Sequence, residues 1–281
     1  MFNYIYRFLV SFLILIIFII FYLSYVGLKT DRFNDLISKR VNYINPKIKL
    51  SLNEVYIKLI PRKLELKVIT YSPEISSNNA KIKIKNIETN ISLLSFISKK
   101  NSLRNISIVS QENNIKNVLK FVRLFQNNIH TILADKFINR GTAFFNINLF
   151  FNEKDEKINN FEINGLIKDL KFIYNTIDLE TDFTFKIDNN IFNITNSKIN
   201  YNGYKFISNN IQIKKNKNNS YNLNGDIENN SLNVEIKKIK NKNFFLNNIL
   251  DNKLNLSTYN NFSFNLTNTF KVKNFKLSSE M

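Results

Sequence analysis

The sequence predicts a mainly β protein, in which an N-terminal transmembrane helix precedes an open, curved antiparallel β-sheet that forms a groove with one embedded amphipathic helix. Three observations predict it. Residues 8–28 form one uncharged apolar run, most later segments alternate apolar and polar side chains, and residues 113–140 keep helical spacing. We therefore divide the chain into an anchor at 1–28, a juxtamembrane helix at 29–46 and a β-rich domain at 47–281.

The apolar run is long enough to cross a bilayer. At about 1.5 Å per residue, 8–28 spans roughly 31 Å of helix, which matches the hydrocarbon core. A cleaved signal peptide is the alternative, but its apolar region is usually about 7–15 residues long and is followed by a small-x-small site. No Ala-x-Ala motif occurs in Tyr22–Gly27. We therefore expect a retained anchor.

The orientation of the anchor follows from the size of what comes after it. Arg7 precedes the span, whereas Lys29, Arg32, Lys39 and Arg40 follow it, and the positive-inside rule alone would favour an external N-terminus. Large domains, however, translocate largely regardless of their charge. We therefore expect the N-terminus in the cytoplasm and the large domain on the other side.

Composition limits the partners. The chain of 281 residues carries 40 basic and 22 acidic side chains, a net charge of +18. The basic residues are mostly lysines spread along a chain rich in Asn, Ile and Phe, which is the usage of an AT-rich genome. We therefore predict no nucleic-acid partner, and attraction to anionic lipid headgroups instead. The absence of cysteine excludes disulfides and thiolate metal sites, and no cofactor is expected.

After the anchor, the hydrophobic period changes from helical to extended. Leu28, Phe33, Leu36 and Ile37 recur at three- and four-residue steps, and Asn45-Pro46 ends the helix. From Lys47 the period is two, as expected for strands with one apolar and one solvated face. The first strands are predicted at Lys47–Asn53, Leu64–Val68 and Lys81–Lys85.

A second helix is predicted near 114–139, with Gly141 as its stop. Its apolar stripe needs a surface to cover, and the apolar face of the sheet is the available one. Strands then resume with Asn-rich turns every 10–14 residues or so, which is typical of an antiparallel meander. They are predicted at Ala143–Phe151, Phe161–Ile163, Phe183–Ile187, Ile191–Ile199, Tyr221–Ile227, Leu232–Ile236, Phe262–Leu266 and Phe270–Leu277.

Phe161–Ile167 and Tyr221–Ile227 share an aromatic-x-aliphatic-Asn-Gly pattern, which predicts a type I′ turn or a bulge in each.

The residues offer no catalytic constellation. His130 is the single histidine and lies among apolar positions of the predicted helix, without a marked nucleophile or acid. The densest acidic group, Glu153, Asp155 and Glu156, sits in a lysine-containing turn and is expected to be solvated. Five glycines leave little scope for a phosphate-binding loop. We therefore do not expect an enzyme.

The informative chemistry is the apolar strand face. Residues at every second position should share this face, and Lys49, Lys67, Lys83 and Asn148 should share the other. Alternation alone leaves two readings open, a closed β-sandwich core and an open groove for acyl chains. The groove-lining candidates are Ile48, Leu50, Leu52, Leu64, Leu66, Ile82, Ile84, Phe145, Ile147, Leu149, Phe183 and Phe185.

The order of elements resembles the N-terminal part of the AsmA-like family, which includes TamB- and YhdP-type proteins. Three segments carry the resemblance: Leu50–Leu66, Ile132–Phe151 with Gly141, and Asn159–Phe172. It implies a Gram-negative inner-membrane anchor, a periplasmic domain, and a β-groove that binds or conducts phospholipid acyl chains in envelope biogenesis. Other envelope proteins are implied as partners.

The resemblance supplies no catalytic residues to carry over. The alternative function is a non-enzymatic envelope scaffold with a closed β-sandwich that supports outer-membrane protein assembly.

Overall fold

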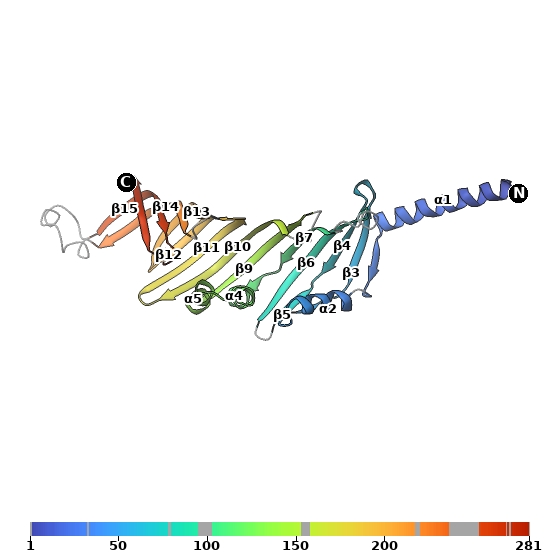
Figure 1. The fold of residues 1–281 in the computed structure, drawn as a ribbon. Helices are drawn as coiled ribbons and strands as arrows, with labels where there is room; N and C mark the ends of the chain where they lie inside the picture. The colour runs from blue at the N-terminus through green and yellow to red at the C-terminus, as the bar shows by residue number, and fades with distance from the viewer. Residues whose placement is uncertain are drawn as a thin grey trace. The chain divides into compact units, whose positions relative to one another are not determined.

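The computed structural model describes residues 2–32, 34–77, 80–94, 103–152, 158–216, 220–235, 253–267, 269 and 271–280. The strands form one antiparallel sheet (Figure 1) in the order β1-β3-β4-β6-β7-β9-β10-β11-β12-β13-β14-β15-β16, with β2, β5 and β8 attached beside it. Among the described strands, β1 and β16 end this order and do not pair with each other, so the sheet is open. The predicted fold class, a mainly β chain with an open antiparallel sheet, is confirmed.

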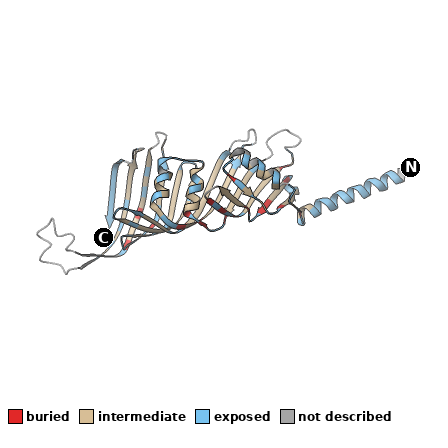
Figure 2. Ribbon diagram, turned by 90° about the horizontal axis from the view of Figure 1, so that it is seen from below, coloured by how far each residue is buried: buried red, intermediate tan, exposed pale blue. Residues whose placement is uncertain are grey.

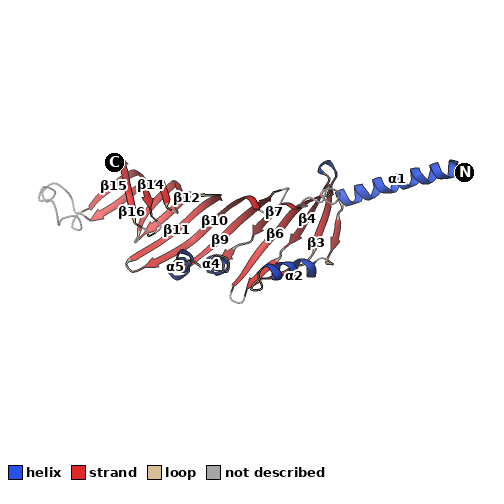
Figure 3. Cartoon of the chain, viewed as in Figure 1, coloured by secondary structure: helices blue, strands red, loops and turns tan. Residues whose placement is uncertain are grey.

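Within the described residues, four α-helices and one 3₁₀ turn accompany the sheet (Figure 3). The helices are α1 (Phe2–Tyr25), α2 (Asn34–Ile44), α4 (Ile115–Arg123) and α5 (Ile129–Phe137), and the 3₁₀ turn is η1 (Pro61–Lys63).

Strands β9 to β16 are longer than every earlier strand except β6. The strands are β1 (Leu28–Thr30), β2 (Lys49–Ser51), β3 (Val55–Ile60), β4 (Glu65–Tyr71), β5 (Glu74–Ser77), β6 (Ala80–Ser92), β7 (Leu103–Ser110), β8 (Asn113–Asn114), β9 (Ile138–Phe151), β10 (Ile158–Tyr174), β11 (Ile177–Asp188), β12 (Ile191–Tyr201), β13 (Tyr204–Lys215), β14 (Tyr221–Glu235), β15 (Lys253–Leu266) and β16 (Val272–Glu280).

The chain forms two compact units. Unit 1 holds residues 1–113, 120–125 and 144–162, and unit 2 holds residues 114–119, 126–143 and 163–281. Most strand residues are only half-buried (Figure 2), because a single sheet layer exposes part of both faces.

In unit 1, α2 packs on β2. Its Ser38 hydroxyl donates to the Leu50 carbonyl at 2.8 Å, and the Asn34 amide donates to the carbonyls of Leu52 and Asn53. These bonds hold α2 against β2 and the two residues that follow it, and they give partners to three backbone carbonyls.

In unit 2, helices lie against one face of the strands (Figure 2). Ile115, at the start of α4, is buried with Ala143 of β9 and Ile167 of β10. Val118, Leu119, Ile138, Leu170, Phe183 and Phe185 pack around these three. The amphipathic helix segment therefore covers the apolar sheet face, as its stripe requires.

The helix predicted near 114–139 is two helices in the structure. Residues 124–128 separate them, and Asn128 caps α5 by accepting from the Thr131 N–H at 3.0 Å. Gly141 is not a helix stop. It lies within β9 at φ +146, and an added Cβ would come 3.1 Å from the Leu170 Cα, so glycine here permits close strand contact.

The two Asn-Gly segments are predicted from the sequence as turns or bulges; neither is a turn, and the second lies next to a register shift. Gly165 lies inside β10 and Gly225 lies inside β14. Gly225 pairs with Ile211 next to a register shift between β13 and β14. Asn-Gly therefore marks a tight mid-strand contact at Gly225.

Candidate functional site: two apolar sheet faces

In unit 1, residues opposite each other in the ladder share a face. Leu66 of β4 lies opposite Leu59 of β3 and Ile91 of β6, and Ile147 of β9 lies opposite Ile108 of β7. Ile108 in turn lies opposite Ile87, on the face of Ile91. We call this surface the unit 1 apolar face. It comprises Ile57, Leu59, Leu66, Val68, Ile87, Ile91, Ile106, Ile108, Ile147 and Leu149.

The other side of the same strands is polar. Lys67 lies opposite Asn90, which lies opposite Asn105, and Asn148 lies opposite Ser107. Two ion pairs reinforce it: Lys67 Nζ is 2.7 Å from Glu88 Oε2, and Arg104 Nε is 3.3 Å from Glu65 Oε1. Leu66, Ile147 and Leu149 thus lie on one face, and Lys67 and Asn148 lie on the opposite one.

Three candidates are buried. Ile48, Ile82 and Ile84 expose at most 5% of their surface and present no lining to a ligand in this structure. A register shift between Ile84 and Asn86 places Ile84 opposite Ser110, on the face of Ile106 and Ile108. Ile82 and Ile84 therefore have the predicted facing but serve as core.

The remaining unit 1 candidates differ in setting. Leu50 is half-buried in β2 opposite Ile75, and Leu52 follows β2. Phe145 lies in β9, where its N–H donates to the Ser110 hydroxyl at 2.8 Å. Leu64 lies outside the sheet, because it ends the η1 turn in a left-handed conformation (φ 49) and the strand begins at Glu65.

In unit 2, Phe183 and Phe185 pack against the core beneath α4, and a ladder of apolar pairs continues from them. Phe185 lies opposite Ile194, Ile194 opposite Ile211, Ile213 opposite Leu223, and Leu223 opposite Phe264. We call this surface the unit 2 apolar face. It comprises Phe183, Phe185, Phe192, Ile194, Ile211, Ile213, Leu223, Phe262, Phe264, Phe275 and Leu277.

Aromatic rings cluster at two places on this face, on β11 and β12 and on β15 and β16. Phe185 and Phe192 meet edge to face with centroids 6.0 Å apart, and Phe264 contacts Phe262 and Phe275 at 6.0 and 6.2 Å. No described helix lies over β13–β16 (Figure 2). Phe275 and Leu277 are 58% and 57% exposed, so apolar surface is available there.

Sequence reasoning named only Phe183 and Phe185 of the unit 2 apolar face. It predicted strands over most of the other residues without assigning them to the lining, and it missed β13, which holds Ile211 and Ile213. The signal was present: Ile211-Gln212-Ile213 alternates in the same way as Phe262-Ser263-Phe264. Asn209-Asn210 before it looks like a turn but lies within the strand, at the register shift.

The opposite face of unit 2 carries a charged network. Lys171 Nζ lies 3.0 Å from Glu180 Oε1 and 3.2 Å from Asp178 Oδ2, and Arg140 Nη2 lies 3.0 Å from the same Glu180 oxygen. Hydrogen bonds to Glu180 and then Asp178 raise the pKa of Lys171 above its usual value, against the opposing effect of desolvation.

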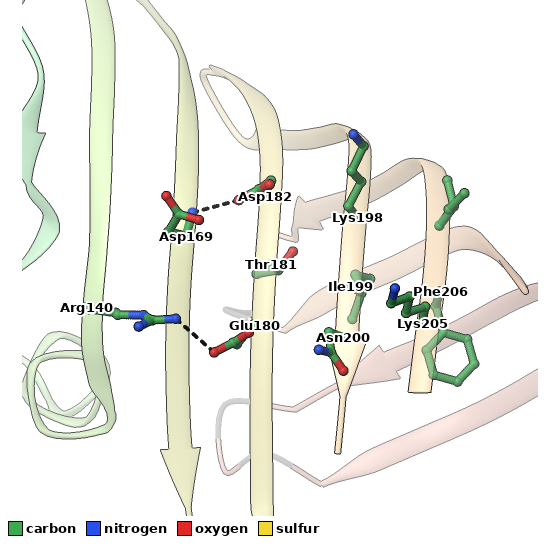
Figure 4. Close-up of a pocket in the computed structure, with 11 residues that line it drawn as sticks. Arg140, Asp169, Glu180, Thr181, Asp182, Lys198, Ile199, Asn200, Lys205 and Phe206 are labelled. Atoms are coloured by element: carbon green, nitrogen blue, oxygen red, sulfur yellow. Dashed lines mark hydrogen bonds and ion pairs between the residues drawn. The ribbon is translucent and has the colours of Figure 1, made fainter. Parts of the chain in front are cut away.

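A hollow of about 410 Å³, lined by charged and apolar side chains, lies beside this network (Figure 4). Its lining includes three cations, Arg140, Lys198 and Lys205, and three carboxylates. Asp182 accepts from the Asp169 N–H at 2.6 Å. The cations and carboxylates are equal in number, so the lining carries no net formal charge. Within the described residues, no group of three His, Cys, Asp or Glu side chains could hold a metal.

The N-terminal helix supplies the last part of the arrangement. Tyr4–Tyr25 of α1 is long and apolar enough to cross a membrane, with a mean hydropathy of 2.7. Beyond Gly27, the Lys29 ammonium pairs with Glu54 and lies 5.8 Å from the centre of the Tyr56 ring. The hydrogen bond to Glu54 raises the pKa of Lys29, against the opposing effect of desolvation.

Comparison with known proteins adds no assignment. No family model, curated protein or solved structure matches the chain. The geometry described above therefore carries the functional argument alone.

Proposed function

We propose that this chain is a single-pass inner-membrane protein with its β-rich domain in the periplasm, and that it binds or conducts phospholipid acyl chains along its apolar sheet faces. The resemblance to the AsmA-like family motivates the compartment and the lipid. The helix α1 supports the anchor, since its length and composition fit a membrane span.

One observation supports lipid binding most directly: over many consecutive strands, one side of the sheet is apolar and the other side is polar. In unit 2, apolar residues lie opposite apolar residues on neighbouring strands: Phe185 opposite Ile194, Ile194 opposite Ile211, and Ile213 opposite Leu223. The positions between them in each strand are polar. A sheet with one open apolar face leaves that surface in water unless something covers it. Acyl chains suit such a surface, because they need apolar area and no hydrogen-bonding partners.

The alternative scaffold function was tied to a closed β-sandwich. The described strands form one open sheet, so that structural premise is absent, although a scaffold could use the open sheet as well. The acyl-chain proposal accounts for the aromatic surface, which a scaffold does not require.

Photo-crosslinking in the intact chain tests the proposal. A crosslinking residue at Leu66 or Ile147 faces the unit 1 apolar face, whereas one at the adjacent Lys67 or Asn148 faces the polar side. We expect phospholipid adducts at the first pair only, detected by mass spectrometry. Absence of adducts at both apolar positions in folded protein would refute lipid binding on this face, and equal capture at all four would show nonspecific contact.

A further inference from the structure

Only two residues connect α1 to the sheet. The helix ends at Tyr25 and β1 begins at Leu28. Gly27 adopts φ +77, and an added Cβ would come 2.9 Å from both the Ile57 carbonyl oxygen and the Lys58 side chain. The backbone at Gly27 therefore lies directly against β3, which fixes where the sheet starts relative to the end of the helix.

Antiparallel pairing of β1 with β3 places the η1 turn near the C-terminal end of α1. Leu28 lies opposite Ile57 and Thr30 opposite Val55, so β3 runs back toward the end of α1 as its numbers rise. Strand β3 continues to Ile60 and leads into η1. The η1 turn is therefore beside the helix end and not at the far edge of the sheet.

The level of the membrane surface is marked by α1 itself. Tyr22 and Tyr25 are 48% and 76% exposed on the last turns of the apolar helix. Tyrosine favours the headgroup region, where its ring is in apolar surroundings and its hydroxyl is hydrated. With α1 in a bilayer, the residues that follow Tyr25 lie at the headgroup level.

The η1 turn presents basic and apolar side chains together. Arg62 and Lys63 are exposed and form no ion pair among the described residues. Leu64 is 46% exposed in a left-handed conformation that bulky residues rarely adopt. Its carbonyl accepts from the Leu93 N–H at 2.8 Å, which brings the 51%-exposed Leu94 next to it.

We propose that η1 and Leu94 form a docking surface for the membrane that α1 crosses. Arg62 and Lys63 bind lipid phosphates, and Leu64 and Leu94 enter the boundary between headgroups and acyl chains. Basic and apolar side chains on one exposed turn are the combination that holds interfacial segments on anionic bilayers. This inference rests on α1 lying in a bilayer, which is part of the proposed function, and is independent of acyl binding by the sheet.

The experiment uses the full chain in nanodiscs, either of phosphatidylcholine alone or mixed with phosphatidylglycerol. Because the chain has no cysteine, a single Leu64→Cys carries an environment-sensitive fluorophore uniquely. Lys83→Cys is the matched control, because Lys83 is also exposed but lies far from Leu64. Ser92 of β6 pairs with Glu65, the neighbour of Leu64, and Lys83 lies nine residues from Ser92 along β6, or about 30 Å at 3.3 Å per residue.

We expect the Leu64 label to emit at shorter wavelength and to be quenched by spin-labelled lipid, and the Lys83 label to be quenched only by aqueous iodide. Arg62→Gln with Lys63→Gln should reduce lipid quenching of the Leu64 label in phosphatidylglycerol nanodiscs more than in phosphatidylcholine. Circular dichroism confirms that each variant retains its β structure.

Equal iodide quenching at both labels, with no lipid quenching at Leu64, would overturn the docking surface. An unchanged response of the double variant would overturn the phosphate contacts of Arg62 and Lys63. Neither outcome bears on acyl binding, because lipid capture at Leu66 and Ile147 is measured separately. Conversely, lost capture with intact docking would refute only the lipid-handling proposal.

Discussion

A buried carboxylate in unit 2 provides a sharp test of the described geometry. Asp226 of β14 is 6% exposed, and its two oxygens accept from consecutive backbone groups, Asn209 N–H and Asn210 N–H, both at 2.8 Å. These two amides lie at the register shift between β13 and β14. The carboxylate therefore replaces the partners that the bulge removes from the ladder.

Replacing Asp226 with asparagine tests this role. An amide side chain has one acceptor oxygen, and its nitrogen is a donor, so it cannot accept both bonds and places one donor against another. A hydrogen bond to a charged group contributes about 1.5–3 kcal/mol, and each 1.4 kcal/mol changes an equilibrium about tenfold. We therefore expect the Asn209 and Asn210 amides to exchange hydrogen roughly 10- to 100-fold faster in Asp226→Asn.

The measurement is amide hydrogen exchange, resolved to peptides that cover β13. Asp178→Asn is the control, because it also removes one carboxylate charge, but from a side chain that is 50% exposed in the ion pair with Lys171. Unchanged exchange at Asn209 and Asn210 in Asp226→Asn would refute the two-acceptor role. Faster exchange throughout unit 2, rather than at these amides, would mean that Asp226 supports the whole unit and not the bulge.

Three further predictions follow from contacts in unit 2. Gly225→Ala should disturb β13 pairing and raise its hydrogen exchange, because the added Cβ would meet a backbone oxygen at 2.7 Å; normal protection would contradict this. Ile115→Ala should destabilise α4 on the sheet by about 2–4 kcal/mol, seen as faster exchange of α4 amides, whereas exposed Lys120→Ala should not. The pKa of Lys171 is higher in the folded protein than its value of 10.5 in the unfolded chain. Its charge therefore stabilises the fold fully at pH values below 10.5, and this contribution is lost as the pH rises through the folded pKa. Wild-type protein and Lys171→Gln should therefore differ in denaturation midpoint at neutral pH and converge in strong alkali; a constant difference would point to packing of the lysine stem instead of its charge.

The sequence predicts the parts of this fold that have a clean period. The apolar run of α1 and the alternation around Leu66 and Ile147 are recognisable because nothing interrupts them. Prediction from the sequence fails where a register shift changes which side of the sheet the following residues face. Without the register shift beside Lys85, the side chain of Ile84 would face the side of Asn86.

Some failures had a detectable signal and others did not. The break between α4 and α5 could have been found from Asn128 followed by Thr131, a helix N-cap pair. Strand β1 could not, because Leu28–Thr30 is too short to show alternation and is defined by its pairing with β3. The hollow beside Glu180 gave no signal either, since Arg140 and Lys205 are brought together only by the folded sheet.

The strand order has a kinetic consequence. From β9 to β16 each strand pairs with its immediate successor in the chain, so most of these pairings close short loops. Loop closure of this kind is fast and carries little entropic penalty, and it permits growth one hairpin at a time from any strand that has already formed. Such a sheet should behave as a nearest-neighbour array, in which loss of one distal hairpin leaves earlier strands folded. Length could then be gained or lost by whole hairpins during evolution without a new folding nucleus.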